Sequence, residues 1–538
     1  MNLDHPTLPE SETSARSHLP HAREPGDLGG AAMPMVGRGQ PRQGSEPQPV
    51  VPYSEESDEG MVPKKPAKMR VTPIESVEGR PEAEGKSVAR NVSPAQDGND
   101  TLTTPQRIGQ RAKQRPEEQF TNLLSHIKLP QLKEAYQSLR KTAAAGVDGV
   151  TWSEYGERLD ERLLDLQDRI HRGSYHPQPV LRVHIPKGDG RTRPLGIPSL
   201  EDKIVQQAAR VIVEPLYEAM FIGFSYGFRP KRSAHDALDA LAVTISRRKV
   251  SWVLDADIRS FFDTIDHGWM QKFIEHRIGD KRMVRLLMKW LHAGVMEEGK
   301  LHEVREGTPQ GGIISPLMAN IYLHYVLDLW VQQWRKKQAR GEVCIVRYAD
   351  DFVMGFQFEQ DALAMKEALA FRFAKFGLEL HPEKTRVLEF GRKARERRER
   401  QGQRKPETFD FLGFTHIAGV SRQGEFQLQR RTSRKKRSAK LRQLRQECRR
   451  RRHRSVTEQH AWLGSVLRGH YRYYAVPTNH PALAQFRRAA ASIWHRSLQR
   501  RSQRGRWSEE QWKSFERRFP LPPPRILHPW PERRFAAR

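Results

Sequence analysis

The middle of the chain carries the alternation of apolar and polar residues that is typical of β-strands. In residues 180–185, apolar side chains at every second position alternate with Arg182 and His184. A Gly-rich turn at 188–190 and an extended segment at 193–198 follow. A strand, a glycine turn and a returning strand in this order predict a β-hairpin with one buried face.

Further apolar residues predict strands that lie beside acidic residues. Residues 253–258 form one predicted strand, and residues 345–346 and 352–354 form two short apolar runs on either side of a turn at 348–351. Short apolar runs bounded by turn signals are typical of strands buried in a sheet. The two flanking runs therefore predict a hairpin with acidic residues at its tip.

Helical periodicity dominates elsewhere. Apolar residues recur at helical spacing in 123–127 and 132–139, and Ser199 with Asp202 three residues later marks the start of another helix. Beyond about residue 430 the pattern is helical with basic faces. We therefore expect a mixed α/β region in the middle of the chain and a mainly helical C-terminal part.

Residues 1–115 lack these patterns. They contain one aromatic residue, Tyr53, and many Pro, Gly, Ser and Glu residues. Such a segment cannot bury enough apolar surface to offset its chain entropy, so we expect a disordered N-terminal extension. Both a solvated tail without a role and a weak RNA-tethering or regulatory role stay open for it.

The net charge of the chain indicates a polyanionic partner. The 538 residues include 93 Lys and Arg against 64 Asp and Glu, which gives a net charge of +29. Residues 430–454 alone hold 14 Lys and Arg against one acid, and residues 430–538 account for +24 of the total. An excess of this size points to nucleic acid or an anionic membrane surface as the partner.

Two further observations narrow the class of protein. The chain has no run of 18 apolar residues, and its first 30 residues lack the apolar segment of a signal peptide. Its two cysteines, Cys344 and Cys448, form neither a disulfide framework nor a Cys-x-x-Cys zinc site. We expect a cytoplasmic protein that handles nucleic acid and has no membrane partner.

Carboxylates gather at the predicted strand ends. Asp350 and Asp351 lie at the hairpin tip, and more acids follow in residues 255–263. Adjacent carboxylates at an apolar tip are unfavourable unless a cation neutralises them. Three convergent carboxylates could hold two Mg²⁺ ions about 3.5–4 Å apart, and the hard oxygen ligands favour magnesium. Taken alone, the turn also fits a plain polar β-turn.

Cations for a nucleotide lie upstream. Lys187 and Arg193 flank the turn at 188–190, where they suit phosphate groups, although two solvated hairpin charges fit the pattern equally well. The Gly-rich loop at 307–312 is not a Walker loop, because no Lys-Ser/Thr pair follows it.

Eight short strings in a fixed order resemble the reverse transcriptases, and closely the group II intron reverse transcriptase/maturases of bacteria. They extend over about residues 116–530 and lie at 146–150, 193–198, 224–230, 257–266, 308–311, 348–351, 381–385 and 411–414. A single Tyr-x-Asp-Asp string is weak evidence, whereas the ordered set is specific. The resemblance implies an α/β right-hand polymerase with fingers, a palm that carries the catalytic β-hairpin, and a mainly helical thumb.

The resemblance also implies roles for residues of the polymerase site. Asp257, Asp350 and Asp351 would be the catalytic, metal-binding carboxylates, with the Ile258 carbonyl as a further metal contact. Phe262 would be the aromatic residue that excludes a ribose 2′-OH. The expected nucleotide-binding residues are Lys187, Arg193, Phe262, Gln310 and Lys384.

Contacts to the nucleic-acid strands are implied in the same way. The expected primer grip is Phe411, Leu412 and Gly413. The expected RNA-binding cations, on the helices beyond residue 430, are Arg434, Lys435, Lys436, Arg437, Arg468 and Arg472.

Five segments are expected in the chain, and the resemblance names the middle three. They are a disordered extension at 1–115, fingers at 116–250, a palm at 251–425, a thumb with the maturase-specific RNA-binding region at 426–510, and a short tail at 511–538. No Cys-pair/His cluster follows residue 510, so we expect no endonuclease domain and a priming strand supplied from elsewhere.

The predicted function is RNA-directed DNA synthesis, by which RNA is copied into cDNA, together with assistance to the splicing and mobility of a group II intron. The expected partners are the intron RNA, a DNA target and primer, dNTPs and two Mg²⁺ ions, and a homodimer stays open. Two alternatives also stay open: a host-adapted reverse transcriptase in phage defence or CRISPR memory, and a splicing cofactor whose polymerase is a relic.

Overall fold

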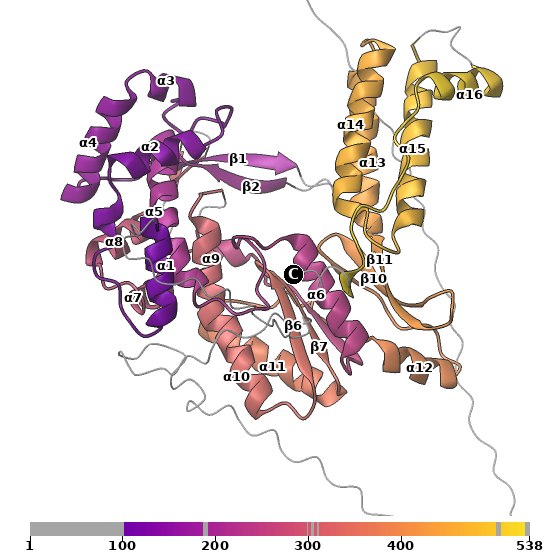
Figure 1. The fold of residues 1–538 in the computed structure, drawn as a ribbon, viewed down its shortest axis with the longest axis horizontal. Coiled ribbons are helices and arrows are strands. Elements are labelled where there is room, and N and C mark those ends of the chain that lie inside the picture. Colours follow the sequence, from indigo (N-terminus) through magenta and orange to yellow (C-terminus); the bar gives the residue numbers. More distant parts are fainter. Residues whose placement is uncertain are drawn as a thin grey trace, which may run out of the picture. The chain divides into compact units, whose positions relative to one another are not determined.

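The computed structural model describes residues 102–186, 192–297, 300–302, 306–308, 311–501 and 507–532 (Figure 1). The disorder expected for residues 1–101 lies outside this range. All described residues belong to one compact unit of the chain. None of the helices within these ranges is long and apolar enough to cross a membrane.

Regular structure begins earlier than the sequence pattern predicts. Helix α1 (Thr104–Gln114) starts at Thr103, whose backbone N–H donates to the Gln106 side chain. Ile108 and Ala112, one turn apart, are buried, and the helix packs against α5 (Leu200–Glu218). The expectation of disorder up to residue 115 is therefore wrong for α1. Two apolar residues suffice there because they share one face and α5 supplies the surface that they cover.

We expect the length of the N-terminal truncation to decide stability. A chain that starts at residue 102 should unfold like the full protein, whereas one that starts at Pro116 loses α1 and exposes its contact surface on α5. Loss of the buried Ile108 side chain and its surroundings should lower the free energy of unfolding by about 2 kcal/mol. Urea denaturation of the two truncated chains measures this difference. Equal denaturation midpoints would show that α1 contributes nothing to the fold.

The β-hairpin predicted near residue 180 is confirmed. Strand β1 (Val180–Pro186) pairs antiparallel with β2 (Thr192–Ile197), with Leu181 opposite Ile197. Two short strands complete a sheet of order β2-β1-β4-β5: β4 (Val295–Glu297) and β5 (Lys300–His302).

Helices surround this sheet and α5. The predicted helix start at Ser199 is confirmed, since its hydroxyl accepts the Asp202 backbone N–H at the beginning of α5. The other helical elements of this part are η2 (Leu124–His126), α2 (Leu129–Ser138), α3 (Trp152–Gly156), α4 (Leu159–Arg172), α7 (His267–Glu275) and α8 (Lys281–Leu291).

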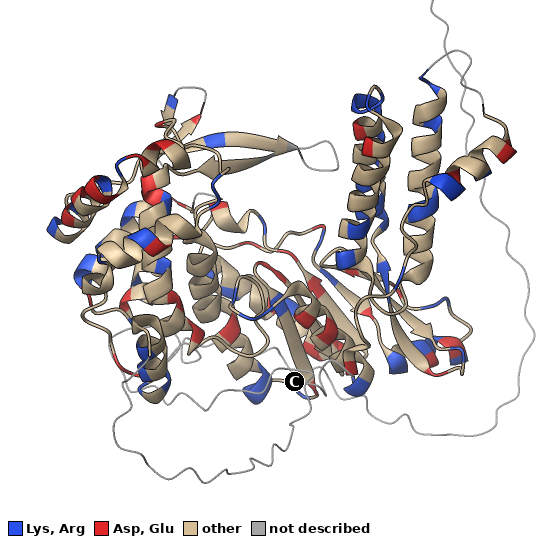
Figure 2. Ribbon diagram, turned by 45° about the horizontal axis from the view of Figure 1, so that its top comes forward, with Lys and Arg blue, Asp and Glu red and all other residues tan. Residues whose placement is uncertain are grey.

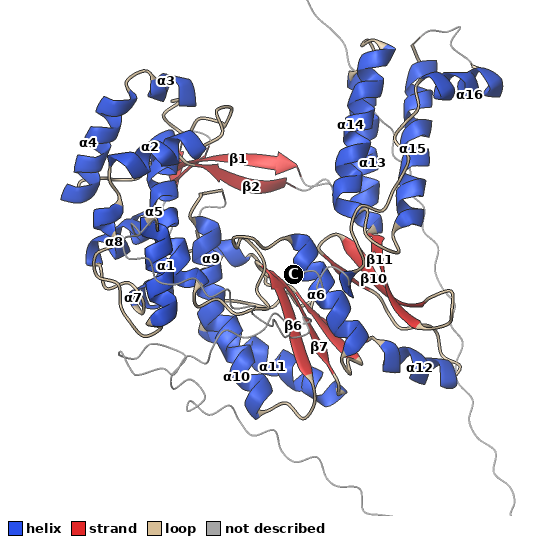
Figure 3. Cartoon of the chain, viewed as in Figure 1, coloured by secondary structure: helices blue, strands red, loops and turns tan. Residues whose placement is uncertain are grey.

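The central sheet has the order β6-β7-β3-β8, and its neighbours are all antiparallel. Its strands are β3 (Trp252–Ala256), β6 (Val343–Tyr348), β7 (Asp351–Phe356) and β8 (Arg386–Glu389). Val346 and Val353 share a core with α6 (Ala234–Arg247). Phe352, which points to the opposite face, meets Phe373 of α11 (Glu359–Lys375). One helix therefore covers each face of the sheet (Figure 3).

Two helices and a π-helical turn stand beside the hairpin of β6 and β7. They form one nearly continuous run: α9 (Ser315–Leu323), the π-helical η4 (His324–Asp328) and α10 (Leu329–Lys337). All five residues of η4 are buried.

A second sheet connects the central sheet to the C-terminal helices. It has the order β11-β10-β9, and β10 is its middle strand. Its strands, with the helix that precedes them, are α12 (Arg392–Arg400), β9 (Phe409–Phe411), β10 (Phe414–Val420) and β11 (Phe426–Thr432). Apolar residues of β9, β10 and β11 belong to the same core as α6 and the central sheet.

The C-terminal helices form a separate apolar core and carry many Lys and Arg residues (Figure 2). They are α13 (Arg434–Arg450), α14 (Val456–Tyr474), α15 (His480–Gln499) and α16 (Glu509–Arg518). After α16 the chain returns along α14, where Tyr471 donates a hydrogen bond to the Pro522 carbonyl. The boundary predicted between residues 510 and 511 is wrong, because it falls inside α16.

Candidate active site

The central sheet brings the three predicted carboxylates to one end. Ala256 of β3 lies opposite Phe352 of β7, so the next residue, Asp257, comes level with Asp351. Strands β6 and β7 pair up to Tyr348 and Asp351, which leaves Ala349 and Asp350 as a two-residue turn. Asp257, Asp350 and Asp351 therefore meet because of the strand register, although about 90 residues separate them in sequence.

Crowding of these carboxylates changes their acidity. Desolvation raises the pKa of Asp350, and the neighbouring Asp257 raises it further. Asp351 has an exposed surface but lies among many protein atoms, and desolvation together with Asp350, Asp257 and Asp255 raises its pKa to about 7. A cluster that resists ionisation in this way favours a cation between its members.

A protein cation already contacts this cluster. The Lys384 ammonium group donates to the Asp257 carboxylate at 2.5 Å. Within the described residues, no three His, Cys, Asp or Glu side chains form a closed metal-binding group. The oxygen donors nevertheless fit Mg²⁺, since Asp257 already binds a cation and the neighbouring carboxylates need one.

The Ile258 carbonyl is also available to a ligand. On either side of Ile258, the Asp257 carbonyl accepts from the His381 N–H, and the Arg259 N–H donates to the Glu379 carbonyl, both at 2.8 Å. This alternation turns the Ile258 carbonyl away from that partner segment. No backbone hydrogen bond within the described ranges reaches it.

The raised pKa of Asp351 leads us to expect pH-dependent stabilisation by magnesium. An unfolded aspartate loses its proton near pH 4, whereas folded Asp351 holds its proton to about pH 7. The folded metal-free protein therefore binds more protons than the unfolded chain in this window, and its stability falls as the pH rises through it. Added Mg²⁺ should raise the Tm more at pH 8 than at pH 6, by roughly 2 °C. In Asp351→Asn this pH difference should shrink, and equal gains in the wild type would contradict the expectation.

The turn at Ala349 and Asp350 is held by a buried arginine that the sequence patterns did not single out. Arg347 is fully buried and donates to both Asp328 oxygens, from Nε at 2.7 Å and from a terminal nitrogen at 2.5 Å. Its other terminal nitrogen donates to the Asn320 side chain and to the Ala349 carbonyl, each at 3.0 Å. The last bond fixes the turn, in which Ala349 has the strained φ of +59°.

Gly227 supports the same turn from a distant segment. A Cβ atom at this position would lie 2.2 Å from the Ala349 nitrogen, so only glycine allows the approach. The flanking backbone is fixed as well: Tyr226 N–H donates to the Arg347 carbonyl at 2.8 Å, and Asn320 donates to the Gly227 carbonyl at 2.8 Å. The resemblance flagged the string at 224–230, but the close approach is visible only in the structure.

Phe262 lies on the short 3₁₀ helix η3 (Phe261–Asp263), close to the Gly-rich loop. Its backbone carbonyl accepts the Thr308 N–H at 2.7 Å, and its side chain is half-buried. Asp266 follows η3 in the chain. It caps helix α7 by accepting the Trp269 N–H at 2.7 Å.

Other predicted nucleotide-binding residues are only partly described. Lys187 and Gln310 lie outside the described residues, as does the turn at 188–190. Arg193 has a described backbone in β2, where it lies opposite Ile185, and no described side chain.

The predicted primer grip is the tight hairpin between β9 and β10. Phe411 is buried and pairs with Phe414, while Leu412 and Gly413 form the turn with φ values of +48° and +81°. Positive φ at both turn positions is typical of a type I′ hairpin. Tyr473 of α14 donates to the Leu412 carbonyl at 2.8 Å, which ties the turn to the C-terminal helices.

The basic residues at the start of α13 point in different directions. Arg434 and Lys435 line a groove, whereas Lys436 is close enough to Asp351 to lower the pKa of that carboxyl. Arg437 donates to the Gln485 side chain of α15. On α14, the predicted pair Arg468 and Arg472 is exposed. One side of α13 packs into the core of the C-terminal helices: Leu444 and Cys448 are buried and Leu441 is partly buried.

The groove beneath α13 has a volume of about 810 Å³ and is lined mainly by polar residues. It extends from the central sheet, at Asp255, across the β9–β10 sheet to α13. Asp255 pairs with Arg386 at 3.7 Å, and desolvation raises its pKa to about 6. The lining residues are Asp255, Arg386, Thr408, Asp410, Thr415, Ser433, Arg434, Lys435, Ser438, Ala439 and Arg442.

Comparison with known proteins places this arrangement in a family. The model of the reverse transcriptase (RNA-dependent DNA polymerase) family matches residues 185–416. Protein YkfC of Escherichia coli is 35% identical over 314 residues, which cover 53% of this chain and 78% of YkfC. The chain belongs to the reverse transcriptase family of group II intron-encoded proteins.

Two other relatives extend this comparison. The group II intron-encoded protein LtrA of Lactococcus lactis is 38% identical over 239 residues, 44% of this chain and 39% of LtrA. An uncharacterized 91 kDa protein in the cob intron of Schizosaccharomyces pombe is 36% identical over 185 residues, 34% of this chain and 23% of that protein. These matches confirm the prediction of an intron-encoded RNA-directed DNA polymerase.

Proposed function

We propose that this chain copies RNA into DNA by two-metal phosphoryl transfer and helps its group II intron RNA to splice and move. The main support for the polymerase activity is the strand register, which brings Asp257 level with Asp351 beside the turn that contains Asp350. These three carboxylates and the Ile258 carbonyl would hold two Mg²⁺ ions. When bound, the ions would supply the Lewis acidity that stabilises the attacking and leaving oxygens.

Lys384 takes two successive roles in this proposal. In the free protein its ammonium group neutralises Asp257. With that carboxylate neutralised by a bound ion, the Lys384 ammonium group would be free to donate a proton to the leaving pyrophosphate. Its side chain is 56% exposed, so it has the freedom to move.

The remaining roles at the nucleotide site follow from the resemblance of the sequence strings to those of reverse transcriptases. Lys187, Arg193 and Gln310 would hold the dNTP, and the half-buried Phe262 ring would exclude a 2′-OH. Phe262 is suited to this role because the Thr308 N–H holds its backbone and Phe261 packs edge-to-face against its ring. The Leu412–Gly413 turn holds the primer end.

The residue ranges proposed for the fingers, palm and thumb differ from those expected from the sequence. Helix α1 joins the fingers, since it packs on α5. Helix α6 joins the palm, because it packs on β6 and shares the core of the central sheet. The thumb and maturase-specific region include α16 and the segment that returns along α14.

The exposed cations of this region would hold the intron RNA through its phosphates. Arg434, Lys435, Arg468 and Arg472 fit this role, whereas Lys436 would serve the polymerase site instead, because its charge lowers the pKa of Asp351. The intron-encoded relatives favour this function over a host-adapted enzyme, and the intact carboxylates favour an active polymerase over a relic. We place the protein in the bacterial cytoplasm, with the DNA target and primer as its further partners.

Two assays test the two parts of the proposal separately. Purified protein should extend a DNA primer on an RNA template with dNTPs and Mg²⁺, and extension should stop when EDTA is added. The same protein should speed the splicing of the group II intron RNA encoded around its gene. Absence of extension under these conditions would refute the polymerase, and an unchanged splicing rate would refute the maturase.

A further inference from the structure

A basic helix and its following loop lie outside the polymerase site and the C-terminal helices. We call residues 391–405, which comprise α12 and this loop, the α12 extension. It holds eight Lys or Arg residues and two Glu residues, a net charge of +6 in fifteen residues. Ala394 is the one residue of α12 that is buried. The extension therefore places concentrated positive charge on the surface.

Ion pairs and hydrogen bonds fix the extension to the sheets beneath it. Glu389 of β8 binds two arginines, accepting from Arg397 Nε at 2.8 Å and from Arg398 at 2.7 Å. Arg395 donates to the Ala418 carbonyl of β10 at 3.1 Å. Arg398 also donates to the Arg404 carbonyl at 2.8 Å, so the loop folds back on the helix. The cationic surface is therefore held in a defined position.

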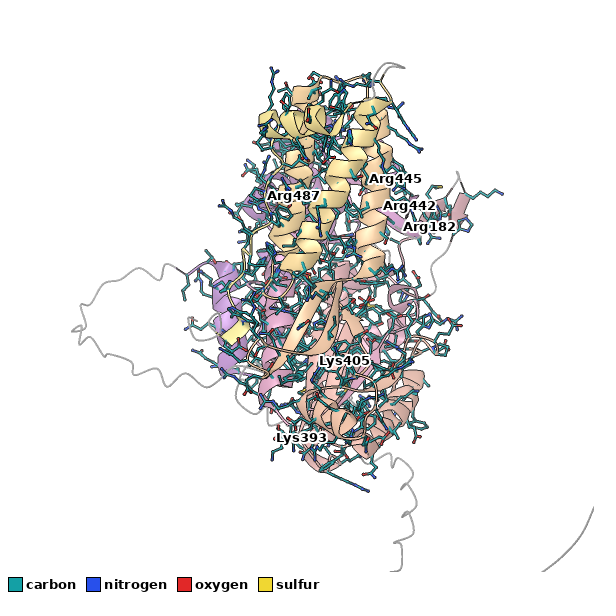
Figure 4. All side chains as sticks on the ribbon, turned by 90° about the vertical axis from the view of Figure 1, so that its right-hand side faces the viewer. Arg182, Lys393, Lys405, Arg442, Arg445 and Arg487 are labelled. Carbon is teal, nitrogen blue, oxygen red and sulfur yellow. The ribbon has the colours of Figure 1, made fainter. Side chains whose placement is uncertain are left out.

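The side chains of four cations of the extension take no part in this anchoring. Lys393, Arg400, Arg404 and Lys405 are exposed, and none of them forms an ion pair with any residue that the structure describes. Figure 4 shows Lys393 and Lys405 on the face of the molecule that also presents Arg442 and Arg445 of α13. Like charges fixed close together repel one another unless an anion lies between them.

The extension continues into the polar groove under α13. Two residues after Lys405 the chain reaches Glu407, which pairs with Arg386 at 3.9 Å, and then Thr408. Arg386 and Thr408 both line the groove. A strand that leaves the groove past Thr408 therefore reaches the four exposed cations of the extension.

We infer that the α12 extension is a second nucleic-acid-binding surface, which holds the phosphodiester backbone of a single strand where it leaves the groove. This inference rests on the proposed function, since that function supplies the strand. The exposed Lys and Arg side chains offer charge contacts to phosphates, which suit the backbone of a strand of any sequence. Binding to it depends on strand length, since a strand too short to pass Thr408 does not reach the extension.

The test compares two fourfold variants of the full chain by the salt dependence of binding. The first replaces Lys393, Arg400, Arg404 and Lys405 by Gln. The matched control replaces four exposed cations elsewhere by Gln: Lys128, Arg140, Lys281 and Lys366. For a 40-nucleotide single-stranded RNA, the first variant should flatten the slope of log K against log salt by up to about 2.8, at about 0.7 per phosphate contact on single strands. A variant with only Lys393→Gln and Lys405→Gln should lose about half as much.

Short and long substrates separate this inference from the proposed function. On a short, saturating primer-template, the extension rate of the first variant should equal that of the wild type. If the wild-type protein does not extend the primer, the proposed polymerase activity is refuted. The slope of log K against log salt still tests nucleic-acid binding by the α12 extension. Repeating the series with single-stranded DNA identifies the source of the strand: a change on RNA, DNA or both supports the surface. An unchanged slope on both, or the same change in the control variant, overturns the inference.

Discussion

Replacing Asp257 by asparagine is expected to lower the rate of DNA synthesis on an RNA template by about 10³-fold or more. The substitution keeps the shape of the side chain and removes the charge that would neutralise a metal ion in the proposed site. Loss of one electrostatic stabiliser in a preorganised site costs about 10²–10³ in rate, and loss of a metal ligand removes more than one such contact. Primer extension with saturating dNTPs and Mg²⁺ measures the change, and RNA affinity should stay within about twofold.

A nearby acid provides the matched control for this expectation. Glu383 is exposed and adjacent to Lys384, yet it lies outside the carboxylate cluster. Glu383→Gln should therefore leave the extension rate within a few-fold of the wild type. A rate for Asp257→Asn close to that of Glu383→Gln would remove Asp257 from the metal site. Since Lys384 pairs with Asp257, Asp257→Asn should also weaken that contact without unfolding the protein.

The local patterns of the sequence predict the polymerase strands well. The apolar runs of β3, β6 and β7 are short and bounded by acids, and the hairpin and its acidic tip follow from them. The helix start at Ser199 also follows from local chemistry, because a hydroxyl and an acid three residues later form an N-cap. These features depend on neighbours within a few residues, which a sequence displays directly.

Features that depend on distant partners could not be predicted in this way. The buried pair of Arg347 and Asp328 joins a strand to a π-helical turn, and nothing near either residue indicates the other. The sequence pattern of α1 resembles that of a polar tail, because most of its apolar contacts are with α5, nearly 100 residues later in the chain. Likewise Lys436 is one of many cations in sequence, and only the fold places it near Asp351.

The buried pair leads to the second large expected effect. Arg347→Met removes the cation and leaves Asp328 fully buried without it. Breaking a buried ion pair by removing one partner costs about 3–5 kcal/mol, a large part of the 5–15 kcal/mol that stabilises a typical protein. Burial already raises the pKa of Asp328, and Arg347 opposes that rise. The destabilisation of the variant should therefore decrease as the pH is lowered and Asp328 takes up a proton.

A double variant separates the stability of the pair from its effect on the turn. Arg347→Met with Asp328→Leu replaces the pair by apolar side chains, which is often close to neutral for stability. The Ala349 carbonyl still lacks its donor in this variant, so the strained turn that carries Asp350 should loosen. A misplacement of about 1 Å at reacting groups can cost about 10²-fold in rate. We therefore expect a folded protein whose primer extension is about 10–100-fold slower.

Another buried arginine provides the control for this experiment. Arg277 is as buried as Arg347, but its guanidinium group contacts the Pro116 carbonyl far from the catalytic turn. Arg277→Met should lower the Tm while the protein that remains folded keeps its rate of extension per molecule. A double variant at Arg347 and Asp328 with the wild-type rate would show that the turn holds its geometry without the arginine. The strained backbone at Ala349 would then be stabilised by the close approach of Gly227 and by the Tyr226 backbone hydrogen bond to residue 347.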